Sequence, residues 1–197
     1  MDDNIVRLLI GITGSPGVGK SYFSKEIAKR VNARIVELND LVKSGGLYSR
    51  IDSSGSVVVK LGALGKAVRA EKRRSRQTLL IVGHLLPELS LKLDIVVVLR
   101  YDPVKLARRL EKRGYNQHKI RENVIAEALD YCGNKSKERK ISKELYEIES
   151  SSKRQKAEII LYVEKRSRGL KAQRPVFNEV NSMPALASLA KGARYGI

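Results

Sequence analysis

The chain has 197 residues with one cysteine and no tryptophan, and its 39 lysines and arginines against 21 acidic residues give a formal net charge of +18. This length predicts one domain with a sizeable core, and the single Cys132 excludes an intrachain disulfide and a cysteine-rich zinc site, which suits a reducing cytoplasm. No apolar run approaches the roughly 18 residues of a membrane span, so we expect a soluble, cytoplasmic protein whose basic charge favours a polyanionic partner such as RNA.

Strands and helices are expected to alternate along most of the chain. Short, largely apolar runs at 7–12, 78–82 and 94–100 are typical of strands buried on both faces of a parallel sheet. Helical patterns cover 20–31, about 61–76 and 103–112, where Asp102 and Pro103 supply an N-cap and a first-turn proline. Two further strand candidates are 34–38 and 144–148. This alternation predicts an α/β sandwich with right-handed crossovers.

The second half of the chain is more charged. Residues 118–140 indicate one or two charged helices, and a closing helix is expected at about 154–166. From 167 to 197 the composition changes to a basic segment with two prolines, several glycines and a weakly amphipathic "PALASLAKGA". We therefore expect a domain over 1–166 and a basic C-terminal extension over 167–197 that is partly disordered when free.

A phosphate-binding loop lies between the first predicted strand and helix. The stretch "GSPGVGKS" matches GxxxxGKS with Gly14, Gly19, Lys20 and Ser21. Glycines let the backbone turn tightly and present N–H groups to a phosphate at the positive end of the helix dipole. Lys20 is expected to bridge the β- and γ-phosphate oxygens of ATP, and the Ser21 hydroxyl to ligate Mg²⁺.

The strand at 78–82 is expected to face this loop, but no carboxylate follows at its tip. Such sites usually place an acid there to help hold the metal. The next acids along the chain are Glu88 and Asp94. His84 follows the strand directly, so it either positions a water or contacts the γ-phosphate, or it has a purely structural role.

Two further segments are candidates for phosphate contacts. In "ELNDLVKSGGLYSRID", Asp40 is expected to cap or anchor a short helix, while Lys43 and Arg50 are placed to meet the phosphate of a second nucleotide; a solvated loop is the alternative. In "RLEKRGY", Arg109 and Arg113 lie one helical turn apart before a break at Gly114. They therefore share a face and are predicted to clamp the transferring phosphoryl oxygens.

Four stretches together resemble one known family: "GITGSPGVGKS", "VELNDLVKSGGLYSRID", "VVVLRYDP" and "RLEKRGYNQHKIREN". They are similar to the atypical adenylate kinases of archaea and the eukaryotic nucleus, also known as the coilin-interacting nuclear ATPase family, from about residue 10 to about 166. The resemblance implies the three-layer nucleoside-monophosphate-kinase fold, with a parallel sheet, an AMP-binding insertion at about 37–60 and a small lid at about 112–122.

The resemblance also implies roles for single residues. Arg113 falls on a lid arginine that contacts ATP, and Lys153 on a basic residue near the adenine. The chain departs from the family at Val82, where an aspartate is usual, and at Lys43, where an arginine is usual. The ATP-loop positions are occupied by Gly17, Gly19, Lys20, Ser21 and Tyr22.

In function, the resemblance implies conversion of ATP and AMP to ADP, together with ATP hydrolysis that assists maturation of the small ribosomal subunit and rRNA processing. The implied partners are AMP, ADP, a ribosomal protein of the small-subunit platform and rRNA. The alternative is a nucleotide-gated module that binds RNA or a ribosomal protein with little AMP kinase activity. The basic stretch "KAVRAEKRRSR" favours a nucleic-acid partner, while a heat-adapted charged surface is the competing explanation.

Overall fold

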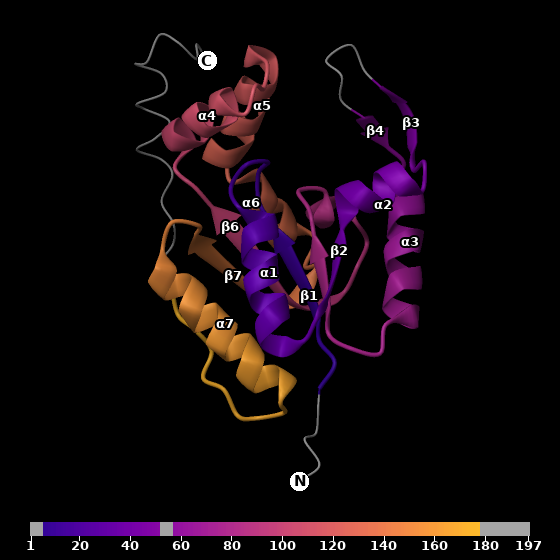
Figure 1. Cartoon of the computed structure of the whole chain (residues 1–197), viewed down its shortest axis with the longest axis vertical. Helices are drawn as coiled ribbons and strands as arrows, with labels where there is room; N and C mark the ends of the chain where they lie inside the picture. The colour runs from indigo at the N-terminus through magenta and orange to yellow at the C-terminus, as the bar shows by residue number, and fades with distance from the viewer. Residues whose placement is uncertain (1–5, 52–56, 178–197) are drawn as a thin grey trace.

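The computed structural model describes residues 6–51 and 57–177. Its centre is a five-stranded sheet in the order β2-β5-β1-β6-β7, with every adjacent pair parallel (Figure 1). The three inner strands, β5, β1 and β6, are buried along most of their length because both sheet faces are covered. The strands are β1 (Leu9–Thr13), β2 (Arg34–Glu37), β5 (Leu79–Val82), β6 (Leu93–Arg100) and β7 (Ser142–Glu149).

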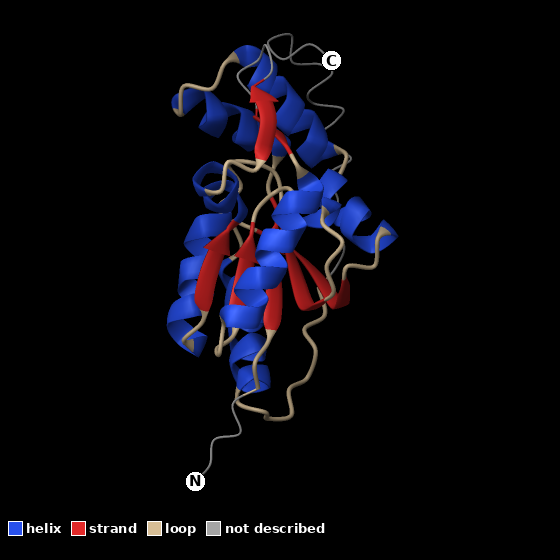
Figure 2. Cartoon of the chain, turned by 90° about the vertical axis from the view of Figure 1, so that its right-hand side faces the viewer, coloured by secondary structure: helices blue, strands red, loops and turns tan. Residues whose placement is uncertain are grey.

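Helices cover both faces of this sheet (Figures 1 and 2). On one face, α1 (Lys20–Val31), α4 (Pro103–Lys112), α5 (Gln117–Ala128) and α7 (Lys153–Ser167) pack on even-numbered residues of β1 and β5 such as Ile10 and Leu80. On the other face, α2 (Leu38–Ser44), α3 (Leu61–Arg74), the short η1 (Leu86–Glu88) and α6 (Tyr131–Glu138) pack on odd-numbered residues such as Leu79 and Ile81. The predicted three-layer α/β fold with a parallel sheet is confirmed.

The predicted insertion at 37–60 has structure of its own. It contains α2 and the antiparallel hairpin of β3 (Tyr48–Ile51) and β4 (Val57–Val59), which the sequence pattern did not predict as strands. The predicted lid at 112–122 spans the α4–α5 connection, where Gly114 has a φ of +75°, and the first half of α5. In Figures 1 and 2 the hairpin and the α4–α5 pair both stand above the same end of the sheet.

Element boundaries differ from the predicted ones in a few places. The charged region 118–140 is two helices, and Asp130 separates them because it adopts a left-handed conformation (φ 51°) and caps α6 through the Gly133 N–H. Residues 170–177 have no regular structure, yet the Phe177 ring contacts Tyr146, with centroids 6.5 Å apart. The predicted "PALASLAKGA" segment lies outside the described residues. No helix within 6–51 and 57–177 is long and apolar enough to cross a bilayer.

Candidate nucleotide-binding site

The loop between β1 and α1 has the conformation that its glycines permit. Gly14, Gly17 and Gly19 have φ values of 133°, 91° and 111°, in a region that side chains disfavour. A Cβ on Gly14 would also lie 2.3 Å from the Leu99 carbonyl oxygen on β6. No side chain caps the start of α1, and its first turn, all of it within the described residues, contains no acidic residue. The N–H groups of that turn are therefore left for an anionic ligand.

Lys20 lies folded back over this loop. Its Nζ donates hydrogen bonds to the carbonyl oxygens of Gly14 at 2.8 Å and Ser15 at 2.9 Å. Burial lowers the pKa of Lys20 to about 8, and the negative charges of Glu127 and Glu37 oppose this effect only in part. An anionic phosphate beside Nζ would stabilise the charged form, so the residue is poised for a phosphate ligand.

The loop opens into a cavity of about 780 Å³, a size typical of ligand sites. Its walls come from five parts of the fold: the loop, the end of β2 with α2, the β3–β4 hairpin, the segment after β5, and the lid with α5. Four cationic side chains line it, one at the start of α1, one on α2 and two on the α4–α5 segment, and two carboxylates accompany them. The cations are Lys20, Lys43, Arg113 and Lys119, and the carboxylates are Glu37 and Glu88.

Most of the site residues predicted from the sequence line this one cavity. The loop contributes Gly17, Gly19, Lys20, Ser21 and Tyr22, and the other walls contribute Lys43, His84 and Arg113. Sequence reasoning assigned no role to Asn39, Tyr115, Lys119 and Asn123, which line it as well. The polar residues Lys119 and Asn123 are one turn apart on α5, a spacing that identifies a shared helix face but not what that face meets.

Five predicted residues are not among the lining residues in the described part of the chain, and one of them is Arg50, which is exposed on β3. Gly14 lies at the base of the loop against Leu99, Asp40 is exposed within α2, and Lys153 is the exposed first residue of α7. Arg109 lies behind the loop and supports it. Its guanidinium donates to the Gly17 carbonyl at 3.0 Å and to the Tyr101 hydroxyl at 2.8 Å, and its Cζ lies 4.1 Å from the Tyr101 ring centroid.

His84 follows β5 on the floor of the cavity. Burial and, to a smaller extent, the positive charges of Lys20 and Lys119 together lower its pKa to about 4. The imidazole is therefore neutral at pH 7, when it can both donate and accept a hydrogen bond but carries no charge. This state favours a contact with a water or a ligand oxygen over an ion pair with phosphate.

The groups available for Mg²⁺ are few. Val82, at the tip of β5, is fully buried in the core, and the described residues contain no group of three or more His, Cys, Asp or Glu side chains that would hold a metal alone. Mg²⁺ at phosphate-transfer sites needs no such cage, because it keeps several waters and binds substrate phosphates with one or two protein oxygens. The exposed Ser21 hydroxyl, with a cavity carboxylate, fits that pattern.

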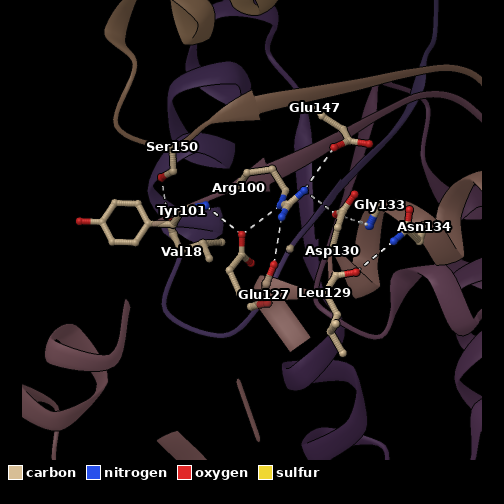
Figure 3. A network of polar contacts seen from close by, with 12 residues as sticks. Val18, Arg100, Tyr101, Glu127, Leu129, Asp130, Gly133, Asn134, Glu147 and Ser150 are labelled. Atoms are coloured by element: carbon tan, nitrogen blue, oxygen red, sulfur yellow. Dashed lines mark hydrogen bonds and ion pairs between the residues drawn. The ribbon is translucent and has the colours of Figure 1, made fainter. Parts of the chain in front are cut away.

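A buried ion-pair network holds the end of β6 against β7 and the α5–α6 junction (Figure 3). Arg100, at the end of β6, donates from Nε to Glu127 at 3.0 Å and pairs with Asp130 at 2.8 Å and Glu147 at 3.4 Å. Glu127 also accepts the Tyr101 N–H at 2.9 Å. The network therefore joins β6, β7 and the α5–α6 junction, and so positions α5 relative to the sheet.

The AAA domain family matches residues 10–130, more than half of the chain, so the chain belongs to this P-loop family. A "Putative adenylate kinase" of Methanosarcina acetivorans is 37% identical over 129 residues, which cover 62% of this chain and 68% of that protein. The protein of the same name from Methanocaldococcus jannaschii is 35% identical over 145 residues, covering 73% and 77%. The chain thus belongs with these archaeal relatives and is a kinase-like P-loop protein.

Among solved structures, the chain is similar to a shikimate kinase from Bacteroides thetaiotaomicron. The two share 14% sequence identity with a TM-score of 0.49, and the match covers 81% of this chain and 97% of that one.

Proposed function

We propose that this protein is an adenylate kinase that transfers the γ-phosphoryl group of ATP to AMP and forms two molecules of ADP. The observation that carries the proposal is one cavity lined by cations from three separate parts of the fold: Lys20 at the loop, Lys43 on α2, and Arg113 and Lys119 on the α4–α5 segment. Cations from the loop and from α2 each suit an anionic phosphate, which fits a donor and an acceptor nucleotide. The names of the archaeal relatives support the same activity.

The chemistry assigned to this cavity is positioning and charge neutralisation. An oxygen of the AMP phosphate attacks the γ-phosphorus, the bond from that phosphorus to the β-bridging oxygen breaks, and ADP leaves with the electron pair. Lys20 and Arg113 neutralise charge on the donor, and Lys43 orients the acceptor. Bound Mg²⁺ would neutralise further phosphate charge, with Ser21 as its protein hydroxyl. No protein base is required, because the attacking phosphate oxygen is already ionised. With water in place of AMP, the same arrangement would hydrolyse ATP.

The test is ADP formation from ATP, measured with and without AMP. We expect AMP to accelerate ADP formation, Lys20→Ala to abolish it, and Lys43→Ala to raise the KM for AMP while leaving the KM for ATP within about twofold. Lys25, exposed on α1 and outside the cavity, gives the control variant Lys25→Ala, which should behave as the wild type. A wild-type rate that is indifferent to AMP would reject the kinase proposal and leave ATP hydrolysis.

A second candidate function, binding of RNA in ribosome maturation, is favoured by the surface of α3. This helix and the segment that follows it expose several cations to solvent, and these are Lys66, Arg69, Lys72, Arg73, Arg74 and, two residues beyond the helix, Arg76. Contacts of such cations with a phosphate backbone weaken steeply with salt. Replacing Lys66, Arg73 and Arg74 with Gln should lower RNA affinity. It should also reduce the slope of log affinity against log salt concentration by about three. The matched control replaces exposed cations of α7, Lys153, Arg154 and Lys165. An equal loss in both triple variants would contradict a role for α3.

A further inference from the structure

We propose that Glu37, at the end of β2, supplies the carboxylate that holds the waters of the nucleotide-bound Mg²⁺, in place of the acid that is missing at the tip of β5. The inference rests on the proposed nucleotide function, and it assigns the metal-facing role to a different strand. In the sequence, Glu37 is only the first residue of the predicted insertion, because the pairing of its strand with the strand that contains Val82 cannot be read from the sequence.

The strand register places Glu37 beside Val82. In the parallel β2–β5 pair, Arg34, Ile35, Val36 and Glu37 lie opposite Leu79, Leu80, Ile81 and Val82 in that order. Paired residues of neighbouring strands point to the same sheet face, and faces alternate along each strand. Val82 packs in the core on the α1 face, Ile35 packs against that same core, and Val36 packs in the core on the opposite face. Glu37 therefore belongs to the α1 face, at the level of Val82 and one strand further from β1.

The carboxylate of Glu37 lies on the donor side of the cavity. It lines the cavity together with Lys20 and Ser21, and it is close enough to Lys20 to raise the pKa of that lysine against the effect of burial. Among the described residues, no side chain forms a hydrogen bond or ion pair with it. Glu88, the other carboxylate of the cavity, accepts a hydrogen bond from the Tyr131 hydroxyl and pairs with Arg139 at 3.5 Å. Glu37 is thus the cavity carboxylate that is free to face a cation.

The extra distance from the loop determines how Glu37 acts. Neighbouring strands are about 4.8 Å apart, and a glutamate side chain recovers only part of that offset relative to an aspartate on β5. Mg²⁺ dehydrates reluctantly and keeps several waters in such sites. Glu37 therefore accepts hydrogen bonds from metal-bound waters, which orients them without displacing them. Carboxylates in this role contribute about 10- to 100-fold to metal affinity.

The experiment measures binding of a non-hydrolysable ATP analogue by calorimetry, once with Mg²⁺ and once with a chelator. The readout is the Kd measured with the chelator divided by the Kd measured with Mg²⁺. This ratio reports how much the metal strengthens binding, without any turnover. We expect Glu37→Gln to lower this ratio by about 10- to 100-fold, with metal-free binding unchanged or tighter because a negative charge near the phosphates is gone. Glu37→Asp, which keeps the charge on a shorter stem, should fall between Glu37→Gln and the wild type.

Glu88→Gln is the matched control, because it removes the same charge from the same cavity, and its ratio should stay within about threefold of the wild type. A Glu37→Gln ratio equal to the wild-type ratio would overturn the inference, as would an effect confined to the KM for AMP. Either result leaves the proposed kinase function standing if the wild type binds the analogue. A wild type that binds no analogue with or without Mg²⁺ rejects the proposed function itself.

Discussion

Lys20 shows how the surrounding fold changes the proton affinity of one residue. Its ammonium is held by the two loop carbonyls of Gly14 and Ser15, and burial lowers its pKa to about 8. The nearby carboxylates of Glu37 and Glu127 keep the pKa from falling further. The residue is therefore charged at pH 7 but loses its proton just above physiological pH when no phosphate is bound.

This pKa predicts the pH dependence of ATP binding. Bound phosphates raise the pKa of Lys20, so below about pH 8 the lysine is charged in both the free and the bound protein, and affinity is maximal. Above about pH 8 the free protein must take up a proton on binding, so we expect ATP affinity to fall by up to tenfold per pH unit. Titration of Kd from pH 7 to 9.5 measures the slope. Lys20→Arg, whose side chain does not titrate in this range, should bind more weakly but with no such slope.

Gly14 is expected to be the least replaceable glycine of the loop. Gly14→Ala combines a φ of +133° with a Cβ that would overlap the Leu99 carbonyl, so we expect a loss of about 2–4 kcal/mol in the free energy of unfolding. Urea denaturation monitored by circular dichroism measures this loss. Gly62→Ala is the control, since an added Cβ there would come within 4 Å of no atom beyond its chain neighbours and its own helix backbone, and alanine favours helix α3. Equal stabilities of the two variants would contradict the steric argument.

The contact of β6 and β7 with the α5–α6 junction depends on charge as well as on apolar packing. Arg100 and Glu127 are 3% and 2% exposed in their side chains, and the single guanidinium faces three carboxylates. Lys137 pairs with Glu147 at 2.6 Å and shares part of this negative charge. The network orders α5, which contributes Lys119 and Asn123 to the cavity.

Removing the central cation should therefore be costly. Arg100→Met leaves the Glu127 carboxylate buried without its main partner, so we expect the free energy of unfolding to fall by about 3–5 kcal/mol. Arg108→Met, at an exposed position on α4, should change it by less than about 0.5 kcal/mol. Chemical denaturation of both variants at pH 7 measures the difference. A small effect of Arg100→Met would mean that solvent reaches the carboxylates without disturbing the fold.

Asp130 gives the same network a pH dependence. Burial raises its pKa to about 6, and the attraction of Arg100 offsets this only in part. A raised carboxyl pKa means that the folded protein holds a proton which the unfolded chain has lost, so stability falls as the pH rises from about 4 to about 6. We expect Asp130→Asn, which keeps a side chain suited to a positive φ, to remove this fall. Urea denaturation between pH 4 and 7 tests it, and an unchanged pH profile would contradict the assignment.

The cavity is a property of the whole molecule, because its walls come from segments between residues 16 and 123. A ligand that spans both ends should stabilise all of these walls together. At a concentration 100 times its Kd, any ligand specific for the folded state raises the free energy of unfolding by about 2.7 kcal/mol. We expect a bisubstrate analogue, two adenosines joined by a phosphate chain, to bind more tightly than ATP.

Lys43→Ala should reduce the affinity for this bisubstrate analogue toward that for ATP, because it weakens only the acceptor end. Melting temperatures at matched concentrations of the two ligands, for the wild type and this variant, measure the effect. A wild type with equal affinity for both ligands would mean that the far end of the cavity holds no nucleotide.

Much of the architecture followed from local sequence. Apolar runs at 78–82 and 94–100 predicted buried parallel strands, and "GSPGVGKS" between a strand and a helix predicted the phosphate-binding loop, because glycine spacing and hydrophobic period are local properties. The predicted loop and lid residues Lys20, Ser21 and Arg113 line one cavity. The β3–β4 hairpin was not predicted, because its few exposed residues carry little periodic pattern.

Only the tertiary structure decided how side chains from distant segments meet. Arg109 and Arg113 share a helical spacing, yet Arg109 supports the loop at Gly17 while Arg113 lines the cavity, because α4 ends between the two contacts. Glu37 lies beside Val82 through the pairing of β2 with β5, across more than 40 residues of sequence. Sequence determined which elements form and where the glycine-rich loop turns between β1 and α1, since these depend on local propensity and backbone geometry. Strand order, register and burial determined which charges face the ligand, because they depend on packing among elements that sequence order alone does not place.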